Sequence, residues 1–83
     1  MRLRVRVRYF GSAKDDAGTD IEEINIAEGG SLSDFKRTLY EEHPSMKTRL
    51  GNLLFAVNQA YSDDSRKLSD GDEIAVFPVV SGG

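Results

Sequence analysis

The strongest constraint on the fold lies at the start of the chain, where basic and apolar residues alternate from Arg2 to Tyr9. Successive side chains of a strand point to opposite faces, so this segment has one apolar face and one basic face. Such a strand belongs in a sheet with one covered face and one open face. The apolar face would carry Leu3, Val5, Val7 and Tyr9, and the basic face would carry Arg2, Arg4, Arg6 and Arg8.

A second strand is predicted at residues 20–26, where Ile24 and Ile26 alternate with polar residues. Ile21 is out of phase with them, which predicts a bulge or a late start of the strand. Residues 11–18 are predicted as a polar turn region, so the two strands should form a hairpin with a long loop.

A helix is predicted from Ser31 to His43. Ser31 with Asp34 three residues later resembles a capping box. The proline after His43 disfavours helical geometry there, so His43 is interpreted as a helix-end residue. Apolar residues recur at helical spacing on one side, which predicts a stripe that packs on the sheet. This stripe consists of Leu32, Phe35 and Leu39.

Further strands are predicted in the second half of the chain. Residues 46–52 are predicted as a mixed segment with a short turn at residues 47–50, and residues 53–57 as a buried strand closed by Asn58-Gln59. Tyr61 marks a short edge strand. In the last strand, residues 73–77, Ile74 and Val76 should point inward and Ala75 and Phe77 outward.

The first and last strands are both strongly apolar on one face and should pair at the centre of a mixed sheet, an α+β roll. The predicted core consists of Leu3, Val5, Val7, Ile24, Ile26, Phe35, Leu39, Val57, Ile74 and Val76.

Composition narrows the possible functions. The chain has 83 residues, which is enough for one small domain, predicted at residues 1–78 with a flexible tail at 79–83. There is no cysteine and only one histidine, which argues against a metal site. The net charge of −3 disfavours nonspecific binding of the whole domain to nucleic acids or anionic membranes. No apolar run approaches the roughly 20 residues of a spanning helix, and a strand at the N-terminus is unlike a signal peptide, so a cytoplasmic location is expected.

The final residues, Phe77-Pro78-Val79-Val80-Ser81-Gly82-Gly83, have the pattern of a tail that acts on another protein. Proline supplies no ladder hydrogen bond, so the sheet should release the chain at or just after Pro78. Glycines without Cβ atoms can enter a narrow slot. The group delivered would be the α-carboxylate of Gly83. A frayed end or a cloning remnant would look similar, but the succession of strand, proline and Gly-Gly favours a functional tail.

Chemistry at a terminal carboxylate requires activation. Its unperturbed pKa is about 3.3–3.7, so it is ionised and a poor electrophile at neutral pH. To carry sulfur it must first become a mixed anhydride such as an acyl-adenylate. The only glycine-rich turn with a following hydroxyl, Gly29-Gly30-Ser31, lacks the spacing and the lysine of a P-loop. A separate activating enzyme is therefore expected.

Three segments, together with this order of elements, resemble the ubiquitin-like sulfur carriers of the β-grasp superfamily, in particular the small subunits of molybdopterin synthases. The segments are Tyr9-Phe10, Phe55-Ala56-Val57-Asn58-Gln59 and residues 68–83, and the last is the most specific. The resemblance spans nearly the whole chain. Two departures are Asp15-Asp16, where many relatives have Arg-Glu, and Val79, where relatives often have a second proline.

The resemblance implies a β-grasp roll with a mixed sheet of four to five strands and one main helix across one face. It also implies that a ubiquitin-activating-like adenylyltransferase uses ATP to adenylate Gly83, and that a sulfur donor protein then supplies the sulfur of a thiocarboxylate. The tail would enter the large synthase subunit and give its sulfur to a pterin precursor in molybdenum cofactor biosynthesis. The chain itself would be non-catalytic and would bind no cofactor.

The same resemblance assigns roles to single residues. Gly83 would bear the sulfur, Ser81 and Gly82 would form the inserted tail, and Phe77 and Pro78 would form a hydrophobic shoulder. For the arginine face, a solvated surface and a docking surface for an acidic partner are both open, with RNA binding less favoured. The predicted partner-binding residues are Phe77, Pro78, Val80, Arg6 and Arg8.

Other functions share this pattern. Sulfur carriers for thiamin synthesis are usually shorter, whereas carriers for cysteine synthesis would look nearly the same. An archaeal-type ubiquitin-like modifier, which forms isopeptide bonds with lysines, would also look similar. A plain interaction domain with an incidental Gly-Gly is the remaining alternative. The sequence does not choose the sulfur acceptor, because the acceptor's identity depends on the partner.

Overall fold

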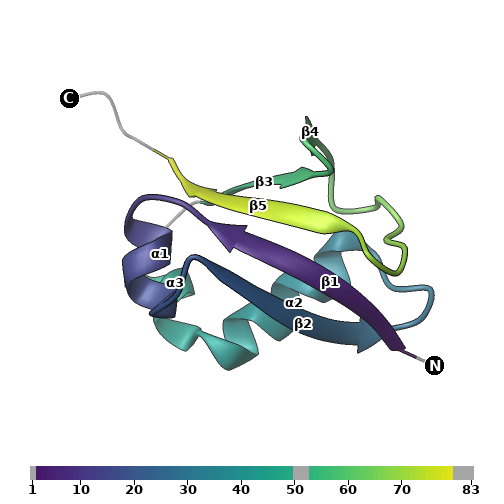
Figure 1. Ribbon diagram of the computed structural model, residues 1–83, viewed down its shortest axis with the longest axis horizontal. Coiled ribbons are helices and arrows are strands. Elements are labelled where there is room, and N and C mark those ends of the chain that lie inside the picture. The colour runs from purple at the N-terminus through teal and green to yellow at the C-terminus, as the bar shows by residue number, and fades with distance from the viewer. Residues whose placement is uncertain (1, 50–52, 80–83) are drawn as a thin grey trace.

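The computed structural model describes residues 2–49 and 53–79, which form one mixed five-stranded sheet with the strand order β2-β1-β5-β3-β4 (Figure 1). Helix α2 crosses one face of this sheet, and α1 and α3 lie together at one end. The elements are β1 (Arg2–Tyr9), α1 (Ser12–Ala17), β2 (Ile21–Ala27), α2 (Leu32–Glu42), α3 (Pro44–Arg49), β3 (Leu53–Val57), β4 (Ala60–Tyr61) and β5 (Glu73–Pro78).

The predicted pairing of the first and last strands is confirmed. β1 and β5 are parallel neighbours at the centre, in a register that places Arg8 beside Ala75. β2 pairs with β1 and β3 with β5, both antiparallel, and β4 adds a short edge beside β3. A parallel central pair between antiparallel neighbours gives the mixed sheet of the expected β-grasp roll.

The alternation along β1 is also confirmed, because its apolar residues are buried and its four arginines are exposed. The side chains under α2 join those of the strands in one core, and all ten predicted core residues belong to it. Further members of this core are Tyr9, Ala13, Leu32, Met46, Phe55 and Leu68.

Helix α2 has the predicted ends. Asp34 accepts a hydrogen bond from the Ser31 backbone N–H at 2.9 Å, and both halves of the capping box are present. At the other end the His43 N–H donates to the Leu39 carbonyl at 2.8 Å, before Pro44. Its buried residues are the predicted stripe of Leu32, Phe35 and Leu39.

Two predictions of local structure are wrong. Residues 12–17, expected in a polar turn, form α1, and the mixed segment from residue 46 belongs largely to α3. Each helix has only six residues and buries one apolar side chain, Ala13 in α1 and Met46 in α3. Helices this short are marginal alone, so packing on the core explains them and local propensity does not.

The expected irregularity at Ile21 is also absent, because the β1–β2 register runs without interruption from the Arg2–Ala27 pair to the Arg8–Ile21 pair. Ile21 lies out of phase with Ile24 because it faces the open side of the sheet, where 45% of its surface is exposed. No helix within the described ranges is long and apolar enough to cross a membrane.

Candidate functional site

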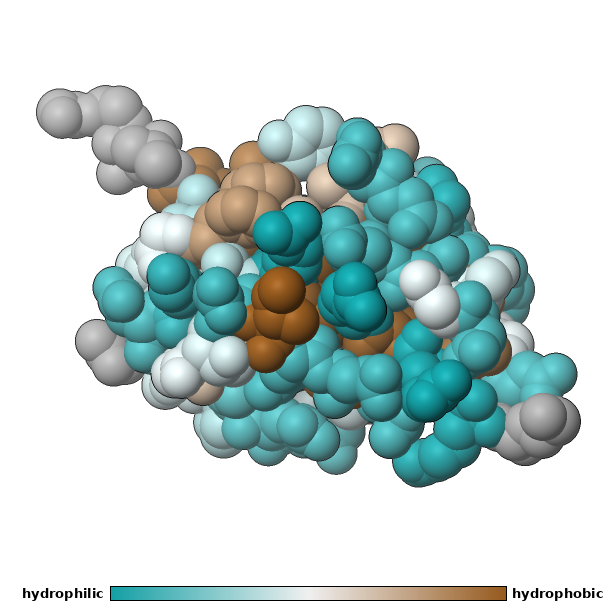
Figure 2. Space-filling model, viewed as in Figure 1, coloured by the Kyte–Doolittle hydropathy of each residue, from teal (hydrophilic) through white to brown (hydrophobic). Residues whose placement is uncertain are grey.

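The open face of the sheet carries an apolar patch over the end of β5, formed by Phe10, Leu54, Tyr61 and Phe77. Figure 2 shows apolar atoms gathered over this part of the face, while hydrophilic atoms cover most of the rest. Leu54 lies opposite Phe77 in the β3–β5 ladder, so both point to the open side. An exposed apolar cluster with a polar surround is the usual form of a protein interaction site.

Two aromatic rings at the centre of this apolar patch hold each other in place. The rings of Phe10 and Phe77 stack with centroids 4.8 Å apart and planes inclined by 13°. The Phe10 N–H also donates to the Val76 carbonyl at 3.1 Å, which fixes the residue after β1 beside β5. Phe77 is therefore pre-positioned on the open face, as a residue that anchors a partner should be.

A shallow depression of about 280 Å³ adjoins the two rings. Its lining includes Arg8, Gln59, Tyr61, Glu73 and Phe77. The backbone turn at Asn58 and Gln59 has positive φ at both residues, which turns the chain back so that β4 pairs beside β3 and Tyr61 lies at the rim. The depression can therefore receive an apolar side chain that is flanked by polar groups.

Pro78 is the last residue of β5, as predicted, and it lies opposite Leu53 in the β3–β5 ladder. Gly11, at a positive φ of 56°, lies so near that a Cβ there would be 3.3 Å from the Pro78 Cγ. The turn at Phe10 and Gly11 thus supports the end of β5 from the side. This support defines where the chain leaves the sheet, next to the apolar patch.

The arginine face is less basic than the sequence alone indicates. Arg6 lies between Glu23 and Glu73 in the sheet register, and Arg8 approaches Glu73 at 3.8 Å. Exposed pairs of this kind contribute little to stability, but they reduce the positive potential of the surface. Arg8 lines the depression, whereas Arg6 lies in a separate polar hollow.

The structure therefore places Phe77 and Arg8 at the same depression, with Pro78 next to Phe77 at the end of β5 and Arg6 two residues before Arg8 in β1. Val80, Ser81, Gly82 and Gly83 lie outside the described residues. Sequence reasoning missed Phe10, Leu54 and Tyr61 as members of the site. Phe10 could have been found, because continuing the alternation of β1 by one residue places an aromatic ring on the arginine face.

A polar cluster under the sheet is structural in character. The Tyr9 hydroxyl donates to Glu22 Oε1 at 2.8 Å, and His43 Nε2 lies 2.7 Å from the same oxygen. Burial, followed by the hydrogen bond to Glu22, raises the pKa of Tyr9 well above its ordinary value. His43 thus ends α2, as interpreted from the sequence, and also joins that end to β2. No group of three potential metal ligands occurs within residues 2–49 and 53–79.

These features define a ubiquitin-like domain with an apolar patch on its open face. A ubiquitin from Caldiarchaeum subterraneum shares the fold at a TM-score of 0.66 and 13% identity, covering all of both chains. The chain belongs to the ThiS family, which it matches over residues 7–83. A molybdopterin synthase sulfur carrier subunit from Chlamydomonas reinhardtii is 30% identical over 98% of this chain and 100% of its own length. One from Mycobacterium tuberculosis is 32% identical, with coverages of 98% and 99%.

Solved structures agree with these relatives. A putative molybdopterin converting factor subunit 1 from Pyrococcus furiosus is 31% identical at a TM-score of 0.86, and the match covers 94% of this chain and 99% of that one. A chain in a complex of subunits 1 and 2 of the molybdopterin-converting factor of Helicobacter pylori is 32% identical at a TM-score of 0.64, covering 98% and 100%.

Proposed function

We propose that this chain is the sulfur carrier subunit of a molybdopterin synthase and that it has no catalytic activity of its own. The observation that carries the proposal is that relatives from an alga and a bacterium, each matched over nearly its full length, are both molybdopterin synthase sulfur carrier subunits. The family match alone would leave the sulfur acceptor open, whereas these relatives favour a pterin precursor over the acceptors of thiamin or cysteine synthesis.

The chemistry is assigned to the carboxylate of Gly83. An activating enzyme transfers AMP from ATP to this carboxylate and releases pyrophosphate, which makes the carbonyl carbon electrophilic. A persulfide sulfur of the donor protein then attacks that carbon, AMP leaves, and the chain is joined to the donor through an acyl disulfide. A second thiol reduces this S–S bond and forms a disulfide with the donor, which releases the thiocarboxylate. The chain needs no nucleotide site or bound cofactor for this role, because the activating enzyme supplies the nucleotide chemistry.

The apolar patch is assigned to partner recognition, with the large synthase subunit as the partner. The complex from Helicobacter pylori contains subunits 1 and 2 of the converting factor, and a chain of that complex is similar to this one. The apolar patch adjoins Pro78, so a partner that covers Phe10 and Phe77 lies where it can also receive residues 79–83. Arg8 at the rim favours an acidic group on the partner.

The experiment that tests this function follows the mass of the intact chain during incubation with the activating enzyme, ATP and the sulfur donor. The chain should gain the mass difference between one sulfur and one oxygen atom, and the loaded chain should convert the pterin precursor when the large subunit is added. Deletion of Gly83, or addition of one alanine after it, should abolish the gain. Either change moves the reacting carbon by the length of one residue, about 3.5 Å. A displacement of about 1 Å can already cost about 100-fold in rate, so the reaction should not proceed.

Other outcomes would replace the proposal. A Gly83 deletion variant that still gains sulfur would show that another group carries it. A chain that gains sulfur but converts only a thiamin or cysteine precursor would be a carrier for that pathway. Covalent conjugates to lysines of other proteins, visible on a denaturing gel, would make the chain a protein modifier.

A further inference from the structure

The outer edge of β2 offers unpaired backbone groups on the side of the molecule away from β3 and β4. The Tyr9 N–H donates to the Asp20 carbonyl at 2.9 Å, and this bond sets the phase of the β1–β2 ladder. Alternate residues of an antiparallel strand bond to the same neighbour, so Glu22, Ile24 and Ile26 direct their backbone groups toward β1. The backbone groups of Ile21, Glu23, Asn25 and Ala27 therefore point outward.

Both ends of this edge are closed, which leaves a short open segment. The Thr19 hydroxyl donates to the Ile21 carbonyl at 2.9 Å, and the Ala27 carbonyl accepts the Gly30 N–H at 3.0 Å. Within the described ranges, no hydrogen bond engages the outward N–H and C=O groups of Glu23 and Asn25. Glu23 and Asn25 are alternate residues of β2, and each offers one N–H and one C=O group. These four groups match the hydrogen-bonding pattern of one added strand.

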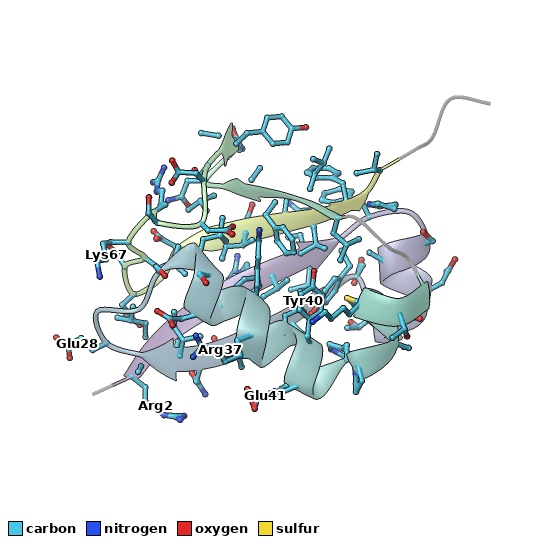
Figure 3. The ribbon with its side chains drawn as sticks, turned by 180° about the vertical axis from the view of Figure 1, so that it is seen from behind. Arg2, Glu28, Arg37, Tyr40, Glu41 and Lys67 are labelled. Carbon is cyan, nitrogen blue, oxygen red and sulfur yellow. The ribbon has the colours of Figure 1, made fainter. Side chains whose placement is uncertain are left out.

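A groove of about 390 Å³ runs beside this edge, between β2 and α2. Asn25, Ile26 and Ala27 form its strand side, and Arg37, Thr38 and Glu41 form part of its helix side. In Figure 3, Arg37 and Glu41 extend from the side of α2 that borders β2, and Arg2 lies by the end of β2. A strand added to β2 would direct alternate side chains into this groove, over Ile26 and Thr38.

The charges of the groove are arranged in order along its length. Arg37 pairs with Asp34 at 3.4 Å, so these two charges offset each other. Arg2 remains at the end where β2 stops, because it lies opposite Ala27. Glu41 and Glu42 line the other end, near the bond between His43 and Glu22, and neither has an ion-pair partner among the described residues.

We propose that the β2–α2 groove binds a short extended peptide segment of a partner protein as an additional antiparallel strand. Its N-terminal residue is acidic and meets Arg2, its C-terminal end is basic and meets Glu41 and Glu42, and uncharged side chains between them enter the groove. An antiparallel segment runs from the Ala27 end of β2 to its Ile21 end. Its N-terminus therefore lies near Arg2 and its C-terminus near Glu41 and Glu42, which sets the charge expected at each end. A second copy of the chain is disfavoured, because two open positions are far fewer than a stable dimer interface contains.

This peptide site is independent of the proposed function, because β2 and the apolar patch near β3 and β4 lie toward opposite edges of the sheet. A partner held at β2 would leave Phe77 free to contact another protein. The groove would therefore tether the chain to an additional protein while the open face engages the large synthase subunit.

The test is a titration of the isotope-labelled full chain with acetyl-Glu-Val-Thr-Val-Thr-Lys-Ser-amide, followed by the amide resonances. We expect saturable shifts at Glu23 and Asn25, with slower hydrogen exchange of both amides, and unchanged resonances at Ala75 and Phe77. The charge-reversed peptide, with Lys first and Glu sixth, should bind more weakly.

Matched peptides separate strand addition from nonspecific contact without any change to the chain. We place the third peptide residue opposite Asn25 and the fifth opposite Glu23, so the third peptide N–H faces β2 and the fourth faces solvent. N-methylation at the third position removes a hydrogen bond and should weaken binding about tenfold, whereas methylation at the fourth should have little effect. On the chain, the double change Glu41→Gln and Glu42→Gln should weaken binding about threefold, and Asp15→Asn on α1 should not.

Equal affinities of the two N-methylated peptides would overturn the proposal, as would shifts confined to the open face or no shift at millimolar peptide. Shifts of Glu23 and Asn25 that depend on protein concentration without peptide would show that a second copy occupies the edge, and would also overturn it.

Discussion

The two faces of the sheet differ although the same strands supply both. The face under α2 is apolar, apart from the Tyr9–Glu22–His43 cluster, and its central side chains are fully buried. The open face combines paired charges on β1, β2 and β5 with the apolar patch around Phe77. Because alternate residues serve different faces, the buried positions of the core and the exposed positions of the proposed docking surface are neighbours that can be changed separately.

The largest effect should come from the covered face. Phe35→Ala removes a fully buried ring from α2, and the cavity left behind should lower the free energy of unfolding by about 3–5 kcal/mol. This is a large share of the stability of a small domain. Denaturant titration measures the change, and a loss below about 1 kcal/mol would mean that the covered face does not carry the stability.

A matched change on the open face should affect binding. Phe77→Ala removes a ring of the same size outside the core, so affinity for the large synthase subunit should fall by about 2 kcal/mol or more, with only a small loss of stability. Calorimetric titration measures the affinity. Ile21→Ala, which shortens another exposed apolar side chain of this face, is the control and should bind normally. Unchanged affinity of Phe77→Ala would remove this residue from the interface.

The smallest effect concerns the start of the helix that covers the sheet. Hydrogen bonds from the Ser31 backbone N–H and hydroxyl hold the pKa of Asp34 below its ordinary value. A lowered pKa in the folded state means that this stabilisation is complete above the ordinary pKa of 3.8 and is lost as the pH falls through the folded value. Asp34→Asn should therefore reduce the acid dependence of the unfolding midpoint. An unchanged pH dependence would contradict this role of the cap.

Most of the fold was predictable because its strands have one-sided patterns. The alternation in β1 and β5 gave both the buried face and the central pairing, and the capping box with His43-Pro44 gave the limits of α2. Helices α1 and α3 were not predictable in the same way. Each depends on one buried side chain, Ala13 or Met46, whose burial is known only after the sheet and α2 are assembled.

The site was predictable where a residue continued a recognised pattern. Phe77 on the open face and the end of the sheet at Pro78 followed from strand parity and proline chemistry. Tyr61 reaches the apolar patch only because Asn58 and Gln59 adopt positive φ values, and the partial neutralisation of Arg6 and Arg8 depends on cross-strand register. Register is a property of paired strands, so an analysis of single segments does not supply it.

The central position of β5 has a consequence for biosynthesis. Among the strands described, β5 is the last to leave the ribosome, and it fills the gap between β1 and β3. A nascent chain that stops before β5 therefore lacks Ile74 and Val76 from its core and leaves strand edges exposed to aggregation. Phe77 belongs to the same strand, so the apolar patch forms only when the core is completed. Incomplete chains would be unfolded and open to degradation, and they would lack the apolar patch that we propose as the docking surface.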